Sequence, residues 1–112
     1  MEKQESLRVE KTPTFARWFD RLKDARARAR ILTRILRLED GSWGDVCAVS
    51  DSVFELRVMA GPGYRLYGTR IGRTIVMLLC GGDEGSQKRD IEKAKCLAGR
   101  VRKERSGYEE SL

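Results

Sequence analysis

Apolar and polar residues alternate along residues 53–82, and this pattern predicts three short β-strands joined by tight turns. The sequence Gly61-Pro62-Gly63 predicts the first turn, because glycine adopts positive φ at little cost and proline fixes φ near the value that a turn requires. The third strand, Thr74 to Cys80, is apolar on both faces, which is typical of a strand in the interior of a sheet. The pattern therefore predicts a small sheet with this strand inside it.

Four polar side chains of the predicted sheet are expected on one face, opposite the apolar positions. Glu55 and Arg57 alternate with apolar residues in the first strand, and Arg65 and Tyr67 take the corresponding face of the second. Two guanidinium groups, a carboxylate and a phenol on one small surface suit the binding of a phosphodiester. They also suit a solvated outer face with cross-strand ion pairs, and the alternation by itself leaves both interpretations open.

Helical periodicity precedes the sheet. Thr12 and Pro13 predict a helix start, because a hydroxyl caps the first turn and proline suits the first helical position. The apolar face of this helix is predicted to comprise Phe15, Trp18, Phe19 and Leu22. Asp24 is predicted to open a second helix that ends at Gly41, a typical C-terminal cap. The buried stripe of the second helix is predicted to comprise Ile31, Leu32, Ile35, Leu36 and Leu38.

A third helix is predicted after the sheet, with Ser86 as its cap. Its apolar face is predicted to comprise Ile91, Ala94, Leu97, Ala98 and Val101. A short strand over residues 7–10 precedes the helices and completes the order β-α-α-β-β-β-α, with residues 46–49 as a possible further strand. This order predicts an α+β fold.

The length of 112 residues and the hydrophobic share of 40% suit one domain with a modest core. We predict a flexible N-terminus at residues 1–6, a single domain at 7–106 and a flexible acidic tail at 107–112. The formal net charge is +6, and the basic excess lies in the predicted helices, whereas residues 41–85 are nearly neutral. This distribution favours a polyanionic partner, either nucleic acid or an acidic protein.

Histidine is absent, and the three cysteines do not have the spacing of a metal site. The missing imidazole excludes Ser-His-Asp and Cys-His nucleophiles, so any catalysis must use Arg, Lys, Tyr or carboxylates. The odd number of cysteines is typical of reduced thiols in the cytosol, and Cys80 is expected to be a buried small apolar residue. No apolar run approaches the roughly 20 residues of a membrane span. We therefore expect a cytoplasmic protein with no membrane partner that needs no metal and no cofactor.

Arginine recurs along one side of the second predicted helix, and the third predicted helix is the most basic element of the chain. Residues 26, 30, 34 and 37 follow the spacing i, i+4, i+8 and i+11, which places four arginines in one ridge. Such a ridge suits contact with RNA phosphates and equally suits a solvated helix face. The predicted RNA-binding residues are Arg30, Arg34, Arg73, Lys88 and Arg89.

Several segments of the chain together resemble one family. They are T-P-T-F-A-R-W-F-D-R-L at 12–22, A-R-I-L-T-R-I-L-R-L at 29–38, G-D-V at 44–46, E-L-R-V at 55–58, G-P-G-Y-R-L-Y at 61–67, L-L-C-G-G-D at 78–83 and Q-K-R-D-I-E-K-A-K at 87–95. Over about residues 7–101 the chain resembles the addiction-module killer proteins, the phage Gp49-like, HigB-type branch of the RelE/ParE toxin superfamily. The segments ELR…GPGYR and LLCGGD…Q..DI..A, taken together, are the most specific part of the resemblance.

The resemblance implies a fold, an activity and partners. The fold is a small, mainly antiparallel sheet packed on an N-terminal helical hairpin, with a C-terminal helix. The activity is that of a type II toxin–antitoxin toxin that cleaves mRNA on the ribosome. The implied partners are the ribosome, mRNA and a helix-turn-helix antitoxin, through which alone operator DNA is contacted. Arg65, in G-Y-R, matches a basic position that the family places around the scissile phosphate, and Arg57, in E-L-R, matches a second.

In such a ribonuclease the RNA 2′-OH attacks the adjacent phosphate, and cations stabilise the charge that develops. Arg57 and Arg65 are the predicted cations. Tyr67 is a candidate acid/base group if neighbouring cations lower its pKa. Glu55 or Glu84 is a candidate for the general base.

The chain departs from the family's usual pattern next to the sheet. Glu84 and Cys47 stand where lysine is usual, and Ser50 and Ser52 replace glycines. An anion at position 84 in place of a cation predicts a weakened activity. Two alternatives stand beside the ribonuclease: a gyrase-poisoning, ParE-like toxin, which the same fold permits, and a catalytically decayed toxin that acts as an antitoxin-bound corepressor, which Glu84 favours.

Overall fold

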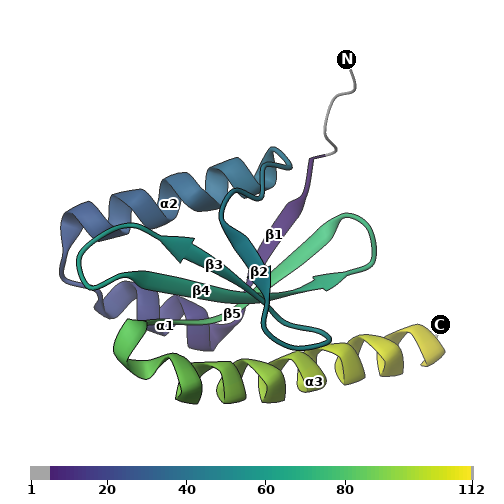
Figure 1. Ribbon diagram of the computed structural model, residues 1–112. Coiled ribbons are helices and arrows are strands. Elements are labelled where there is room, and N and C mark those ends of the chain that lie inside the picture. The colour runs from purple at the N-terminus through teal and green to yellow at the C-terminus, as the bar shows by residue number, and fades with distance from the viewer. Residues whose placement is uncertain (1–5, 112) are drawn as a thin grey trace.

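A five-stranded sheet with helices on both faces forms the described part of the protein (Figure 1). The computed structural model describes the chain from residue 6 to residue 111, with side chains up to residue 105. Its elements are β1 (Arg8–Lys11), α1 (Pro13–Arg21), α2 (Ala25–Glu39), β2 (Val46–Ala48), β3 (Phe54–Val58), β4 (Tyr64–Ile71), β5 (Ile75–Asp83), a 3-10 turn η1 (Glu84–Ser86) and α3 (Gln87–Ser111). The predicted α+β fold is confirmed, and the arrangement is consistent with a RelE/ParE-like fold.

The strands follow the order β1-β5-β4-β3-β2 across the sheet. β1 pairs with β5 in parallel, and the other three pairs are antiparallel. β5 lies between β1 and β4, so the prediction of an interior strand is confirmed. The possible further strand at 46–49 is the edge strand β2, and the sheet therefore has one strand more than the predicted order.

The predicted start of α1 and both predicted ends of α2 are confirmed. The Thr12 hydroxyl accepts a hydrogen bond from the N–H of Phe15 at 3.1 Å and donates one to the carbonyl of Leu79 at 2.6 Å, which ties the start of α1 to β5. The Asp24 carboxylate accepts from two backbone N–H groups in the first turn of α2. Gly41, with a φ of 88°, ends the same helix in the left-handed region that glycine adopts without strain.

Two apolar clusters cover the two faces of the sheet. α1 and α2 pack on one face, whose buried strand residues are Leu56, Val58, Leu66, Val76 and Leu78. α3 packs on the other, where Ala94 and Ala98 meet Val53, Tyr67, Leu79 and Cys80. A bulge between β4 and β5 explains why Leu79 and Cys80 share a face, because Tyr67 pairs with Cys80 and Gly68 with Leu78.

The predicted buried stripe of α2 is wrong at two positions. Leu32 and Leu36 are 45% and 63% exposed. The residues that face the sheet are Ala27, Ile31, Ile35 and Leu38. Leu32 and Leu36 each lie one residue, or about 100°, further around the helix than Ile31 and Ile35. The sequence offers two neighbouring apolar stripes, and packing against the sheet selects the one that contains the small Ala27.

The two predicted termini fall only partly within the described residues. Residues 1–5 of the predicted flexible N-terminus lie outside them. The backbone of α3 continues to Ser111, so the segment predicted as a tail after residue 106 extends this helix. None of the helices in the described range is long and apolar enough to cross a membrane.

Candidate functional site

Arg57 and Arg65 lie opposite each other on neighbouring strands. The register of β3 and β4 pairs Arg57 with Arg65 and Glu55 with Tyr67. Directly paired residues of antiparallel strands point to the same face, so the predicted grouping of these four side chains is confirmed. Arg57 is exposed, and no acidic side chain of the described residues pairs with it. The Arg65 side chain is only 15% exposed.

A cleft of about 510 Å³ brings Arg57, Arg65 and Glu84 together. Its other lining residues are Asp45, Val58, Met59, Gly61, Pro62, Gly63 and Tyr64. A second cleft of about 410 Å³ adjoins it on the side of α2, with four lining residues in common, Asp45, Arg57, Val58 and Met59. Arg57 therefore stands where the two clefts meet.

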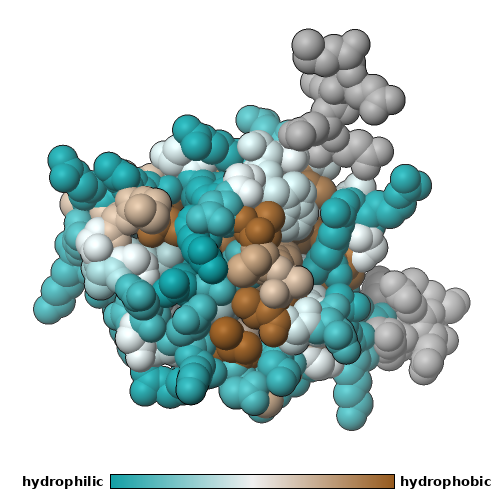
Figure 2. All heavy atoms as spheres, in the orientation of Figure 1, coloured by the Kyte–Doolittle hydropathy of each residue, from teal (hydrophilic) through white to brown (hydrophobic). Residues whose placement is uncertain are grey.

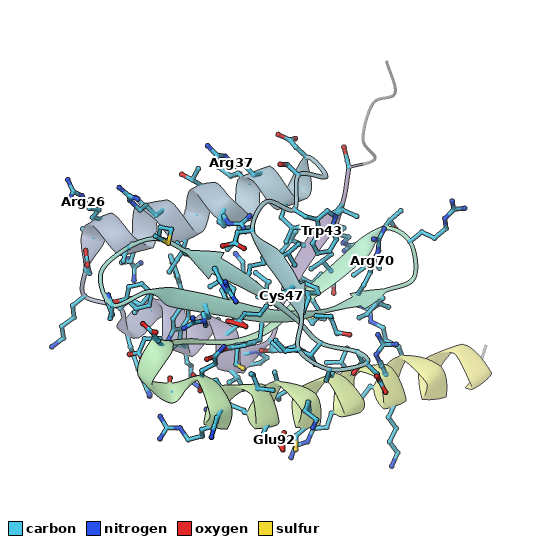
Figure 3. All side chains as sticks on the ribbon, in the orientation of Figure 1. Arg26, Arg37, Trp43, Cys47, Arg70 and Glu92 are labelled. Carbon is cyan, nitrogen blue, oxygen red and sulfur yellow. The ribbon has the colours of Figure 1, made fainter. Side chains whose placement is uncertain are left out.

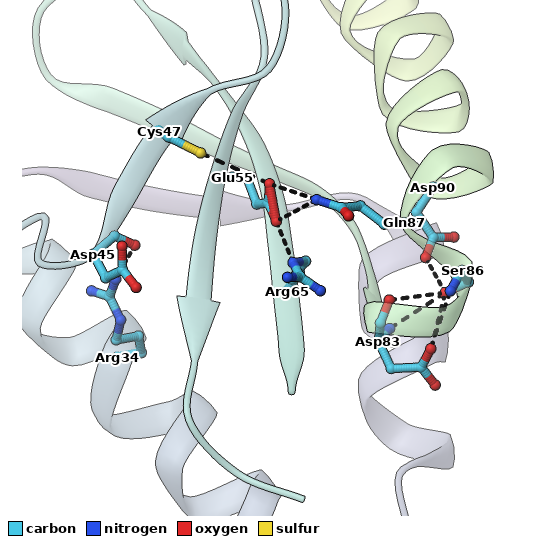
Figure 4. A network of polar contacts seen from close by, with 9 residues as sticks. All are labelled: Arg34, Asp45, Cys47, Glu55, Arg65, Asp83, Ser86, Gln87 and Asp90. Atoms are coloured by element: carbon cyan, nitrogen blue, oxygen red, sulfur yellow. Dashed lines mark hydrogen bonds and ion pairs between the residues drawn. The ribbon is translucent and has the colours of Figure 1, made fainter. Parts of the chain in front are cut away.

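The Glu55 carboxylate is the centre of a polar network under this surface (Figure 4). Its Oε1 lies 2.5 Å from Arg65 Nε, and Gln87 Nε2 donates to Oε1 and Oε2 at 3.2 and 3.3 Å. The Cys47 thiol lies 3.9 Å from Oε2. The Glu55 side chain is 1% exposed, so the expected cross-strand ion pair is present but its carboxylate is shielded from solvent. Both oxygens of Glu55 are occupied.

Arg65 is held by charge more than by hydrogen bonding. Its Nε is close to Glu55 but lacks the alignment of a hydrogen bond, and its Nη1 is buried without a hydrogen-bond partner among the described residues. A buried guanidinium with unused donors is costly unless a further acceptor is supplied. Arg65 also lines the cleft, so its guanidinium charge acts on an anion bound there, although the Nε and Nη1 atoms are themselves buried.

Tyr67 does not line the cleft, and the expected lowering of its pKa is wrong. The ring is completely buried under α3, beside Ala94 and Ala98. Burial raises the pKa of Tyr67; the Glu55 and Asp90 carboxylates raise it further, and Arg65 only partly opposes them. The hydroxyl makes no hydrogen bond to any described residue. Tyr67 is therefore a protonated core residue near neutral pH.

Arg30 and Arg34, predicted to contact RNA, donate hydrogen bonds to carbonyl groups of the protein's own backbone. Arg34 donates to the carbonyls of Trp43, Asp45 and Arg57 at 2.7, 2.8 and 3.3 Å. Gly44 permits this approach, because a Cβ there would overlap the Arg34 guanidinium. Arg30 donates to the carbonyl of Met59, the residue after the end of β3, at 2.7 Å. These two arginines clamp α2 to the strand that carries Arg57.

The other predicted RNA-binding residues lie in two separate regions, Arg73 in one and Lys88 with Arg89 in the other. Arg73 is in the turn between β4 and β5, at the opposite end of that hairpin from Arg65, which pairs with Gly82. Lys88 and Arg89 are exposed at the start of α3, where they line a surface hollow with Glu84. On α2, Arg26 and Arg37 point outward from the helix (Figure 3). The structure therefore places Arg73 away from the cleft.

Gly81 and Gly82 let two side chains approach β5 from opposite faces. A Cβ on Gly81 would overlap the Trp18 ring, and one on Gly82 would overlap the Asp90 carboxylate. Asp90 is 4% exposed and accepts a hydrogen bond from the Ser86 hydroxyl. Ser86, predicted as the helix cap, instead forms a capping box with Asp83 in η1, and α3 begins one residue later. These contacts fix the start of α3 beside Arg65.

The sequence patterns assigned no role to Gln87, Cys47 and Asp90. Gln87 and Cys47 contact Glu55, and Asp90 holds the start of α3 against β5. Gln87 and Asp90 are spaced i, i+3, which places them on one side of α3, and both belong to the Q..DI pattern. Cys47 is paired in register with Glu55 on the edge strand β2. An apolar strip of the surface lies over β2, between hydrophilic residues over α2 and α3 (Figure 2). Polar contacts in this region are therefore not evident from hydropathy.

Comparison with known proteins relates the chain to a protein of similar length. No family model matches the chain. The chain is 45% identical over 93 residues to an uncharacterized protein of Haemophilus influenzae, and the match covers 83% of this chain and 94% of that protein. The chain therefore belongs to the same family as this H. influenzae protein. Because that relative is uncharacterized, the relation assigns no activity.

Proposed function

We propose that this protein is the toxin of a type II toxin–antitoxin system and inhibits translation by cleaving mRNA on the ribosome. The observation that carries the proposal is the direct pairing of Arg57 with Arg65 in one cleft. Two adjacent guanidinium groups suit a phosphodiester, because each presents several N–H donors to phosphate oxygens. The sequence resemblance to the HigB-type branch of the RelE/ParE superfamily supports the same assignment, and so does the α+β fold.

The proposed reaction uses the substrate's own nucleophile. A base removes the proton of the RNA 2′-OH, the oxygen attacks the adjacent phosphorus to form a 2′,3′-cyclic phosphate, and the bond to the 5′-oxygen of the next nucleotide breaks, with that oxygen taking up a proton from water. Arg57, which has no acidic partner among the described residues, and Arg65, which lines the same cleft, stabilise the negative charge that develops on the phosphate. The reaction requires no metal or cofactor.

Glu84 is the general base in this proposal. Of the three groups predicted for acid/base work, Glu55 has both oxygens occupied and Tyr67 is buried with a raised pKa. Glu84 is exposed and lines the same cleft as the two arginines. Its Oε2 lies 3.9 Å from where a Cβ on Gly63 would stand, so the carboxylate faces the turn between β3 and β4 across the cleft.

The proposed partners follow from the exposed cations. Arg26, Arg37, Lys88 and Arg89 offer phosphate-binding charge on α2 and α3. We assign them to ribosomal RNA or to acidic residues of a helix-turn-helix antitoxin, through which the complex contacts operator DNA. The site of action is the cytoplasm, where ribosomes and mRNA are.

One observation favours a second candidate function. Glu84 places a carboxylate beside two arginines, and a carboxylate near a phosphate opposes its binding. A protein whose catalysis has decayed in this way would act only as an antitoxin-bound corepressor. No contact in the described residues favours the gyrase-poisoning alternative over these two.

Induced expression without the antitoxin separates the three functions. For the ribonuclease we expect growth arrest and new mRNA ends inside translated frames, lost in an Arg65→Ala variant and kept in Arg17→Ala, a control that removes an exposed arginine lining neither cleft. Arrest with intact mRNA and broken chromosomal DNA would indicate the gyrase poison. Normal growth would indicate the corepressor. Efficient cleavage of naked RNA by the purified protein would contradict ribosome dependence.

A further inference from the structure

Met59 is an apolar side chain in an unusual place. It is 79% exposed, more than any other large hydrophobic residue in the described range. It directly follows Val58, which is 4% exposed and anchors the end of β3 in the core. Met59 lines both clefts, and so it stands with Arg57 at their junction. An apolar side chain there does not serve phosphate binding.

The backbone around Met59 is held in place. Arg30 Nη1 donates to the Met59 carbonyl at 2.7 Å. On either side, the N–H of Ala60 donates to the Val58 carbonyl and the N–H of Gly63 donates to the Ala60 carbonyl, both at 3.0 Å. The exposure of Met59 therefore belongs to a fixed turn that presents the side chain to the clefts.

Asp45 is the neighbouring polar group of the same junction. It lines both clefts and is exposed. The N–H of Arg57 donates to the Asp45 carbonyl at 3.1 Å, and Arg34 donates to the same carbonyl at 2.8 Å, so the backbone of Asp45 is fixed beside Arg57. Its carboxylate repels a phosphate but accepts hydrogen bonds from N–H groups.

We propose that Met59 and Asp45 form a base-binding subsite for the nucleotide next to the scissile phosphate. This rests on the proposed ribonuclease function and adds to it a determinant of cleavage specificity. The polarisable thioether of Met59 packs on the face of the base, and Asp45 accepts from the base edge. Guanine is the preferred base, because its N1–H and its amino group together present two donors to one carboxylate.

The test uses purified full-length protein and ribosomes programmed with mRNAs that differ in the A-site codon. Single-turnover cleavage gives the maximal rate and the half-saturating protein concentration for each codon. For Met59→Ala we expect the half-saturating concentration to rise about five- to tenfold with an unchanged maximal rate, since stacking on a base contributes at this level. Met59→Leu, which keeps an apolar side chain of similar volume, should behave as wild type.

Two further variants complete the design. Leu36→Ala removes another exposed hydrophobic residue that lines neither cleft and should change nothing. Asp45→Asn should reduce the preference for guanine codons about tenfold while cleavage at other codons continues. Thermal unfolding of each variant establishes that the fold is kept.

The outcomes separate the subsite from the proposed function. Wild-type cleavage with unchanged codon preference and unchanged half-saturation in Met59→Ala and Asp45→Asn would overturn the subsite alone. No cleavage by the wild-type protein, indistinguishable from Arg65→Ala, would overturn the ribonuclease and the subsite with it.

Discussion

The two faces of the sheet bury the same strands in different ways. On the face under α1 and α2, the buried strand residues are all apolar, and Leu56 and Leu66 meet there without a polar group between them. On the face under α3, Glu55, Tyr67 and Asp90 are buried beside small alanines of the helix. One face therefore gains stability from simple apolar burial, whereas the other keeps charged and polar groups out of water.

Three polar residues of this face, Glu55, Gln87 and Asp90, hold the groups beside the cleft. Gln87, from the first turn of α3, reaches Glu55, and Glu55 in turn pairs with Arg65. Asp90 and Gly82 bring the start of α3 against β5. A buried ion pair adds little net stability, so a gain in stability does not explain the pair of Glu55 and Arg65. The difference between the faces indicates that the α1/α2 face specifies the fold and the α3 face positions the site.

The largest expected effect is that of Arg65→Ala, which breaks the α3 face. Loss of a cation that stabilises the transition state should lower the cleavage rate by about 10²–10³-fold. The Glu55 carboxylate would also remain buried without its cation, so the free energy of unfolding should fall by about 3–5 kcal/mol. Single-turnover cleavage and denaturant unfolding measure the two effects.

A matched change on the opposite face shows whether stability alone explains the loss. Leu66→Ala should cost about 2–5 kcal/mol of unfolding free energy, because it leaves a cavity in the apolar cluster. The folded fraction of Leu66→Ala should nevertheless cleave at the wild-type rate. Equal losses of activity per folded molecule in both variants would contradict the division between the faces.

Much of the fold is predictable from local pattern, and the same is true of part of the site. Thr12 and Asp24 cap their helices as expected, and alternation places Arg57 and Arg65 on one face. Alternation does not show what covers that face. The position of α3 over Tyr67 depends on contacts between distant segments, and so do the clamps made by Arg30 and Arg34. For this reason the burial of Tyr67 and the backbone contacts of Arg30 and Arg34 are not evident from sequence, and the RNA-binding role of the two arginines stays a prediction.

The next effect in size concerns the carboxylate of the cleft. If Glu84 is the general base, Glu84→Gln should lower the cleavage rate about 10²-fold with little effect on stability, because acid–base groups contribute at least this much and the side chain is exposed. Glu84→Lys separates this role from simple repulsion. If Glu84 is the base, Glu84→Lys should be inactive. If the carboxylate only repels the phosphate, Glu84→Lys should cleave faster than wild type. An unchanged rate in both variants would place Glu84 outside the reaction.

A smaller effect is expected where the network only positions Arg65. Glu55→Gln keeps the side-chain volume and a hydrogen-bond acceptor for Gln87 but removes the charge that holds Arg65. We expect the maximal cleavage rate to fall about tenfold, from misplacement of the guanidinium, with an unchanged half-saturating concentration. A fall in stability without any change in maximal rate would make Glu55 a structural residue only.

The smallest expected effect is that of Tyr67→Phe. This change removes a buried polar group and makes the face under α3 more like the apolar face under α1 and α2. The Tyr67 hydroxyl is buried without a partner among the described residues, so its removal should leave the cleavage rate unchanged and raise the free energy of unfolding by about 1 kcal/mol.

The raised pKa of Tyr67 makes the stability of the wild-type protein depend on pH. The unfolded chain loses the phenolic proton near pH 10 and the folded protein does not, so wild-type stability declines as pH rises above about 10. Tyr67→Phe lacks the contribution of the phenol to this decline, and its stability advantage should grow there, because Cys80, whose pKa burial also raises, contributes equally in both proteins. Denaturant unfolding between pH 7 and pH 11 measures the difference in stability. Loss of cleavage in Tyr67→Phe would contradict the exclusion of the phenol from catalysis.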